Sequence, residues 1–290
     1  MNSVRRFHEP RLRKPVAIIA FEGWNDACEA ASSAATYTLH VGKRTEPFAV
    51  IDPDEFYDFQ QHRPIVTAND GGHRSLSWPT TRFHAVKIPD HPQDLIVVTG
   101  DEPSFRWRTY ARIVTSILVE HDVEQVILLG AFIGQVGHRR PTPIIGVATQ
   151  PERVGHFDLL PSNYEGPTGI ISVVMEACRE VGIPAISLWA ATPHYLAASP
   201  NPQAMLALLK KASEISGLPL DLADLNDVVR QYLDKVESAI GASEDLSDYI
   251  TNLERDEDES GINQQLVSEE AEGFLDEIED FLRQNPDSSR

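Results

Sequence analysis

The sequence predicts an α/β protein in which a mostly parallel sheet is covered by helices on both faces. Apolar runs without polar interruption, at 15–21, 94–100 and 184–191, have the composition of strands buried on both faces. Helix-like segments alternate with these runs, which is typical of parallel sheets. Because 41% of the 290 residues are apolar, the chain can also bury a substantial core.

The first strand leads into a helix. The run at 15–21 is followed by a polar loop at 22–26 and an Ala-rich segment at 27–40, which together predict the first half of a βαβ unit. Short strands on either side of the turn at 69–72 predict a small antiparallel excursion from the sheet. The further strands expected before residue 150 are 48–51, 64–67, 75–78, 83–88, 94–100, 123–129 and 144–148.

Helices are expected after residue 103, from residue 170 and throughout the chain beyond residue 200. Apolar residues recur at spacings of three and four from Leu222 to Leu253, which predicts helix-on-helix packing within the chain or between chains. These patterns divide the chain into four segments. They are an N-terminal extension at 1–14, an α/β core at 15–200, a helical extension on that core at 201–255, and an acidic linker with a terminal amphipathic helix at 256–290.

The formal net charge is −19, and it is concentrated near the C-terminus. Residues 243–290 hold 16 acidic and 3 basic side chains, a net charge of −13, which leaves −6 for residues 1–242. Such a balance argues against nucleic acid or an anionic membrane as partners. Two cysteines are too few for a disulfide framework, and no apolar run reaches membrane-spanning length. We therefore expect a cytoplasmic protein without metal or cofactor.

The most polar and turn-rich stretch in the body of the chain is 162–169, directly before an apolar helix pattern. If Pro167 occupies the first helical position, the small residues around it leave the first helix amides open to a carboxylate, a phosphate or a ribose-type oxygen. The alternative is a plain helix start. Ser162 and Glu165 have the spacing of a capping box, which needs no ligand.

Polar side chains also follow several of the predicted strands. Ligands of parallel α/β sheets bind beyond the carboxyl ends of the strands, so these side chains would line one pocket. Its acids, arginines and open helix start would suit a polar or phosphorylated small molecule. The candidate pocket residues are Asn25, Asp26, Glu102, Arg106, Arg108, Gln135, Tyr164, Glu165 and His194.

Each candidate also has a purely structural interpretation. Asp26 can cap the helix that follows it. Glu102 can form a local ion pair with Arg106 or Arg108, and His194 can be a hydrogen-bonding loop histidine. Trp107 can stack on an arginine in place of a ligand.

No motif nominates a catalytic residue. There is no phosphate-binding loop, no nucleophile elbow and no His or Cys cluster with metal-ligand spacing. Gly130, Gly134 and Gly137 do not match the dinucleotide fingerprint, and the basic run at 138–140 is too short to indicate RNA binding.

Separated motifs in this order resemble one known family. They are Phe-Glu-Gly-Trp-Asn-Asp-Ala at 21–27, Glu-Pro-Ser-Phe-Arg-Trp-Arg at 102–108, Tyr-Glu-Gly-Pro-Thr-Gly at 164–169, Leu-Trp-Ala-Ala at 188–191 and Pro-His-Tyr at 193–195. Together they are similar to the bacterial, largely actinobacterial, branch of the proteasome assembly chaperone 2 family. The resemblance extends over roughly residues 15–255.

This resemblance implies a three-layer α/β/α core like that of nucleoside phosphorylases, and often a homotrimer. Eukaryotic relatives pair proteasome α-subunits during assembly, and the family offers no agreed catalytic residues. We therefore favour a non-enzymatic assembly or protein-binding module, in which 256–290 docks on a partner or a neighbouring subunit. The alternative is binding, phosphorolysis or hydrolysis of a nucleoside-like or phosphorylated small molecule at the strand-end pocket.

Overall fold

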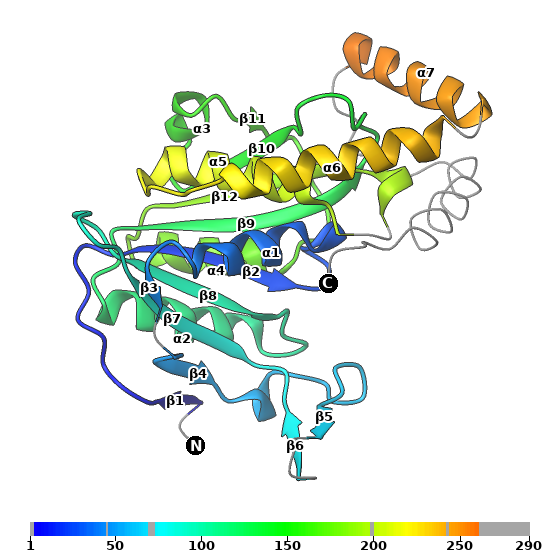
Figure 1. The fold of residues 1–290 in the computed structure, drawn as a ribbon. Helices are drawn as coiled ribbons and strands as arrows, with labels where there is room; N and C mark the ends of the chain where they lie inside the picture. The colour runs from blue at the N-terminus through cyan, green and yellow to red at the C-terminus, as the bar shows by residue number, and fades with distance from the viewer. Residues whose placement is uncertain (1–2, 45, 69–72, 198–199, 242–243, 261–290) are drawn as a thin grey trace.

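A mixed sheet of ten strands forms the centre of the protein, with helices on both of its faces (Figure 1). The computed structural model describes residues 3–44, 46–68, 73–197, 200–241 and 244–260. The strands are β1 (Val4–Arg6), β2 (Val16–Glu22), β3 (Lys43–Arg44), β4 (Ala49–Ile51), β5 (Ile65–Ala68), β6 (Arg74–Ser77), β7 (Thr81–Lys87), β8 (Leu95–Asp101), β9 (Gln125–Gly134), β10 (Ile144–Ala148), β11 (Leu160–Pro161) and β12 (Ala185–Pro193). The helices are α1 (Ala30–Thr38), α2 (Trp107–Glu120), α3 (Glu152–His156), α4 (Ile170–Glu180), α5 (Pro202–Ser216), α6 (Ala223–Ile240) and α7 (Glu244–Ser260), with single 3₁₀ turns η1 (Ala27–Glu29), η2 (Pro53–Glu55) and η3 (His194–Leu196).

The middle of the sheet is parallel, in the order β8-β2-β9-β12. These four strands come from the predicted apolar runs. Val16 to Phe21 on β2, for example, are fully buried because helices cover both faces of the strand. The expectation of strands alternating with helices holds for this centre.

The outer parts of the sheet are antiparallel, so the prediction of a mostly parallel sheet is wrong there. β7 pairs antiparallel with β8 and continues to β4 and β1, while β10 pairs antiparallel with β12. β1 lies within the segment expected to be an N-terminal extension, and it forms one edge of the sheet. The connections into β7 and β10 lack a crossover helix, and antiparallel neighbours do not need one.

Two apolar cores lie on opposite faces of the sheet. α1, α5 and α6 cover one face, with Ala31, Ala35 and Leu209 packed on alternate residues of the central strands. α2 and α4 cover the other face, where Val114 and Val174 pack on the intervening residues. Figure 1 shows α1 and α6 in front of the sheet and α2 behind it.

The C-terminal helices form a third, smaller core. Val236 and Ile240 of α6 and Leu246 and Ile250 of α7 pack around Tyr195, directly beyond the end of β12. This confirms helix-on-helix packing within the chain. α7 continues to Ser260, so residues 256–260 of the predicted acidic linker are helical.

Two further predictions can be compared with the described residues. The expected terminal amphipathic helix falls at 261–290, which lies outside them. Among the helices that the structure describes, none combines the length and apolar character needed to cross a lipid bilayer.

Candidate functional site at the carboxyl ends of the strands

The sheet brings the predicted strand ends together at one edge. Because β8, β2, β9 and β12 are neighbouring parallel strands, the segments after Asp101, Glu22, Gly134 and Pro193 all emerge on the same side. Whether these residues bind a ligand stays a prediction, but their contacts show what each side chain does in the folded chain.

Glu102, directly after β8, links separate segments at this edge. One of its carboxylate oxygens, Oε1, accepts a hydrogen bond from Asn25 Nδ2 at 2.6 Å and another from the Ile170 backbone amide at 2.7 Å. Ile170 is the first residue of α4, so the carboxylate provides the anion that a helix start favours. The helix start expected to attract an anionic ligand is therefore already paired with a side chain of the same protein.

Asn25 joins the first loop to the same cluster. Its side chain is fully buried, and its backbone carbonyl accepts a hydrogen bond from the Ala131 amide. Gly169 packs so closely on this side chain that a Cβ there would overlap Asn25 Oδ1. Oδ1 itself is buried and has no hydrogen-bond partner among the residues that the structure describes. Three loops distant in sequence thus meet at Asn25, Glu102 and Gly169.

Asp26 caps α1, as its structural interpretation predicts. Its Oδ1 accepts hydrogen bonds from the Ala31 amide at 2.8 Å and the Ser32 amide at 3.0 Å. Burial raises the pKa of this carboxyl group, and the hydrogen bonds to the charged form oppose the shift. The chain turns sharply between Asp26 and α1, where Cys28 and Glu29 both adopt left-handed backbone conformations (φ 56° and 52°).

Neither arginine near Glu102 pairs with it in the hydrogen bonds and ion pairs described for this edge, so the predicted local ion pair is wrong. Arg106 instead binds Glu55 of the preceding η2 turn, with Nη1 2.5 Å from Oε2, and its guanidinium lies over the Phe56 ring. Arg108 is exposed on the first turn of α2. The Trp107 indole donates a hydrogen bond to the Pro103 carbonyl and does not stack on either arginine.

Residues 162–168 form an exposed loop, Gly169 is buried, and the helix begins after it. α4 begins at Ile170, so Pro167 does not occupy the first helical position and Ser162 and Glu165 do not form a capping box. Ser162 accepts a hydrogen bond from the Tyr164 amide, and the Tyr164 hydroxyl donates to the Pro167 carbonyl. Glu165 is exposed, and Gln135 is partly buried after β9.

His194 takes part in docking α7. It is almost fully buried after β12, and its Nε2 lies 2.9 Å from the Tyr249 hydroxyl of α7. Burial lowers the pKa of this histidine.

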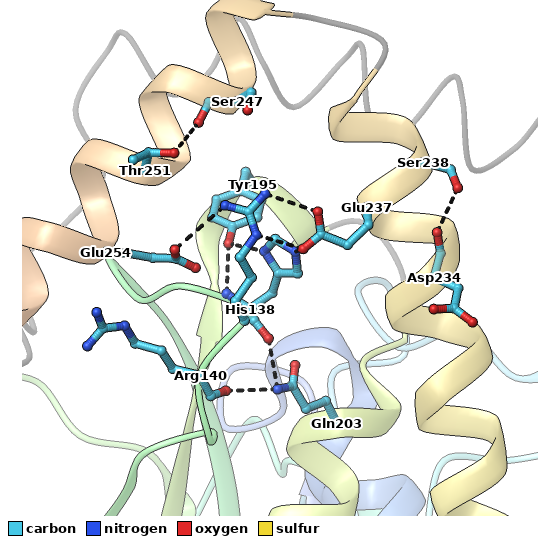
Figure 2. A network of polar contacts seen from close by, with 11 residues as sticks. His138, Arg140, Tyr195, Gln203, Asp234, Glu237, Ser238, Ser247, Thr251 and Glu254 are labelled. Carbon is cyan, nitrogen blue, oxygen red and sulfur yellow. Dashed lines mark hydrogen bonds and ion pairs between the residues drawn. The ribbon is translucent and has the colours of Figure 1, made fainter.

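A second buried histidine, His138, docks α6 in a similar way (Figure 2). Its Nε2 lies 3.1 Å from a Glu237 carboxylate oxygen, and its Nδ1 lies 2.8 Å from the Tyr195 hydroxyl. Because a carboxylate only accepts, Nε2 carries the proton and Nδ1 accepts from Tyr195. Burial lowers the pKa of His138 and outweighs the opposing effect of Glu237. The neutral ring thus links the loop after β9 to α6.

The adjacent arginine extends this network. Arg139 forms a two-bond ion pair with Glu237, at 2.7 and 3.0 Å, and lies 3.7 Å from a Glu254 oxygen of α7. Gln203 of α5 donates to the carbonyls of His138 and Arg140 (Figure 2). The basic run at 138–140 therefore holds the acidic C-terminal helices, a role that the sequence analysis missed.

Comparisons with known proteins identify the family. A model of the PAC2 family matches residues 20–240. The chain belongs to the PAC2 family. The protein is 42% identical to a PAC2 family protein from Streptomyces avermitilis over 81% of this chain and 99% of that one, with a TM-score of 0.75. It is 35% identical, with the same coverage and TM-score, to the Mycobacterium tuberculosis proteasome-assembly chaperone homologue Rv2125. No functionally curated protein matches it in sequence.

A more distant likeness supports the fold alone. The archaeal proteasome activator PbaB of Pyrococcus furiosus is 17% identical over 81% of this chain and 97% of that one, with a TM-score of 0.64.

The strand-end edge of this PAC2 protein also exposes aromatic side chains. Trp24, Phe105 and Tyr164 are 62%, 50% and 51% exposed, and each belongs to one of the three loops that meet at Glu102. Exposed aromatic residues of this kind are enriched where proteins bind proteins.

Two surface hollows lie elsewhere on the molecule. One, of about 330 Å³, follows α1 and is lined by residues that include Glu22, Tyr37 and His40. The other, of about 380 Å³, lies between α1, the start of α5 and α6, and is lined by Glu29 and Lys235 among others. None of the nine candidate residues lines either hollow. Within the described residues, no three His, Cys, Asp or Glu side chains are grouped as metal ligands would be.

Proposed function

We propose that this PAC2 protein is a non-enzymatic assembly module that binds proteasome subunits through the strand-end edge of its sheet. Two similarities support the choice of partner. A relative at 35% identity is described as a proteasome-assembly chaperone homologue, and PbaB, which shares the fold, is described as a proteasome activator. In line with the family, we also propose a cytoplasmic homotrimer with a nucleoside phosphorylase-like core.

The observation that carries this proposal is the use of the strand-end polar groups inside the fold. Glu102 bonds Asn25 and α4, Asp26 bonds α1, Arg106 bonds Glu55 and His194 bonds Tyr249. Contacts of this kind position the loops, which supports a structural role for these side chains. The same loops expose the aromatic side chains of Trp24, Phe105 and Tyr164, and exposed aromatic residues on a rigid support are typical of protein-binding surfaces.

Binding to unassembled proteasome α-subunits of an actinobacterium tests the proposal. The purified protein is mixed with α-subunits alone, and complex formation is measured by sedimentation velocity. We expect a complex with the wild-type protein and a loss of affinity of about tenfold or more for Trp24→Ala combined with Phe105→Ala, because aromatic anchors dominate such interfaces.

Val119→Ser provides the matched control. Val119 is an apolar side chain, 48% exposed near the end of α2, and it lies away from the strand-end loops. The proposal fails if the wild-type protein does not bind α-subunits, or if the control substitution weakens binding as much as the aromatic pair does.

One observation favours the alternative, a small polar ligand at the same edge. Within the described part of the chain the buried Asn25 Oδ1 has no hydrogen-bond partner, and a buried acceptor left unpaired is costly unless a donor reaches it. A thermal-shift screen against nucleosides, nucleotides, sugar phosphates and phosphate tests this alternative. A ligand at a hundred times its dissociation constant would add about 2.7 kcal/mol of stability. A shift with any of these compounds that is lost in Asn25→Ala would favour the alternative, and no shift would exclude them as ligands.

A further inference from the structure

The β5–β6 hairpin is exposed along its whole length in the described fold. All eight of its strand residues are exposed, and its strands pair only with each other. Figure 1 shows it projecting from the end of the molecule near β1 and β4. A two-stranded hairpin is at best marginally stable in water unless further strands or a helix pack on it. The hairpin therefore lacks a covering partner.

The two faces of the hairpin differ. Val66 and Leu76 are directly paired across the strands, so their side chains fall on one face, and Trp78 follows directly after the end of β6. On the opposite face the Thr67 and Ser75 hydroxyls hydrogen-bond to each other, and Ile65 is paired with Ser77. We call the surface of Val66, Leu76 and Trp78 the apolar hairpin face.

This face is anchored and has basic neighbours. The Trp78 ring packs edge-on against Phe59 with the ring centroids 4.8 Å apart, and Phe59 packs against the core beneath α2 and α4. Arg63 precedes the hairpin and Arg74 begins β6, and both are exposed. A suitable partner would present an apolar stripe with carboxylates beside it.

The chain itself contains such a segment. Residues 261–290 include eight acidic and two basic side chains, in contrast to the basic neighbours of the hairpin face. Apolar residues recur there at the spacing of one helix face, which is a pattern suited to packing on a small sheet. These apolar residues are Phe274, Leu275, Ile278, Phe281 and Leu282.

We propose that the apolar hairpin face docks residues 274–282 of a second copy of this chain. Complementary charge and apolar pattern select the segment. A second copy, not the same chain, is proposed because α7, which directly precedes the segment, and the hairpin lie at opposite ends of the molecule (Figure 1). This inference concerns self-association and goes beyond the proposed binding of proteasome subunits.

Sedimentation equilibrium of the full-length protein tests the proposal through two kinds of variant. Val66→Thr combined with Leu76→Thr removes apolar contact area from the hairpin, and Phe274→Ser combined with Phe281→Ser removes it from the segment. Each pair should weaken self-association by about tenfold or more, because each would lose two buried apolar anchors.

The opposite face of the hairpin offers a matched control. Ile65→Thr is the same type of substitution on the same strand at a residue that is 66% exposed, and it should leave self-association unchanged. Mixing the hairpin variant with the segment variant should restore association, because the mixture keeps one intact hairpin face and one intact segment.

Several results would overturn the proposal. A wild-type protein that stays monomeric would show that no second copy docks. The hairpin variant could weaken self-association while the segment variant leaves it unchanged. That result would show that another surface, such as a second hairpin, covers the apolar hairpin face. Failure of the mixture to associate, or an equal effect of Ile65→Thr, would also contradict it.

Discussion

Replacing Glu102 by alanine tests whether the strand-end carboxylate is part of the fold. The substitution removes two short hydrogen bonds to the carboxylate, from Asn25 Nδ2 at 2.6 Å and from the Ile170 amide at 2.7 Å. Hydrogen bonds to a charged group contribute about 1.5–3 kcal/mol each, and the lower value applies because Glu102 is partly exposed. We expect Glu102→Ala to lower the free energy of unfolding by about 3 kcal/mol and the melting temperature by about 6 °C.

Differential scanning calorimetry and urea unfolding measure this change. Glu102→Gln keeps an oxygen that can accept from the Ile170 amide but loses the charge, so it should have about half the effect. Glu165→Ala is the matched control, because Glu165 is an exposed glutamate on the same edge and its loss should change stability by less than about 0.5 kcal/mol. The reasoning is refuted if Glu102→Ala unfolds like the wild type.

Three further predictions concern the strand-end loops and the docked helices. Gly169→Ala should lower the free energy of unfolding by about 1–3 kcal/mol, because the new Cβ overlaps Asn25, whereas Gly155→Ala, with open space around it, should be tolerated in the same urea titration. Burial lowers the pKa of His194, so as the pH falls this histidine is protonated in the unfolded chain before it is protonated in the folded protein. The free energy of unfolding therefore decreases as the pH drops below about 6.5. Melting curves at neutral and mildly acidic pH should show a smaller decrease in melting temperature for His194→Gln than for the wild type. A double-mutant cycle on Arg139 and Glu237 should give a coupling of about 0.5–1 kcal/mol that shrinks as salt is added, because both side chains are partly exposed, and a coupling that does not depend on salt would be unexpected.

Local sequence patterns were sufficient to predict the central strands and one cap. The apolar runs at 15–21, 94–100 and 184–191 became β2, β8 and β12 because burial on both faces demands continuous apolar sequence. Asp26 was correctly interpreted as a cap because its partners, Ala31 and Ser32, follow within six residues. The separated family motifs also identified the family correctly.

The pairings within the site could not be predicted, because they join residues far apart in the chain. Glu102 reaches the amide of Ile170 across 68 residues, and Arg106 reaches back 51 residues to Glu55. The sequence analysis instead predicted an ion pair between Glu102 and one of the arginines beside it in the sequence. The same limit hid the group that caps α4, because the anion at its first amide comes from another loop and not from the preceding turn.

The docking of the C-terminal helices depends on opposite charges that are visible in the sequence but were not considered together. The basic run at 138–140 and the acidity of residues 243–290 were each noted, but Glu237 precedes that acidic segment, and its pairing with Arg139 spans 98 residues. The opposite charges of the loop after β9 and of the C-terminal helices would have suggested that these segments pair. The antiparallel direction of β10 could not be predicted in this way, because the apolar composition of a short strand does not depend on the direction in which the strand runs.

Hydrogen exchange on the protein with and without proteasome α-subunits tests the central claim most directly. The account predicts that α-subunits slow amide exchange in the three loops that carry the exposed aromatics, at 23–26, 102–106 and 162–168, while the covered ends of β9 and β12 change little. Absence of protection in these loops, or protection confined to other surfaces, would contradict the claim that the strand-end edge is the docking surface.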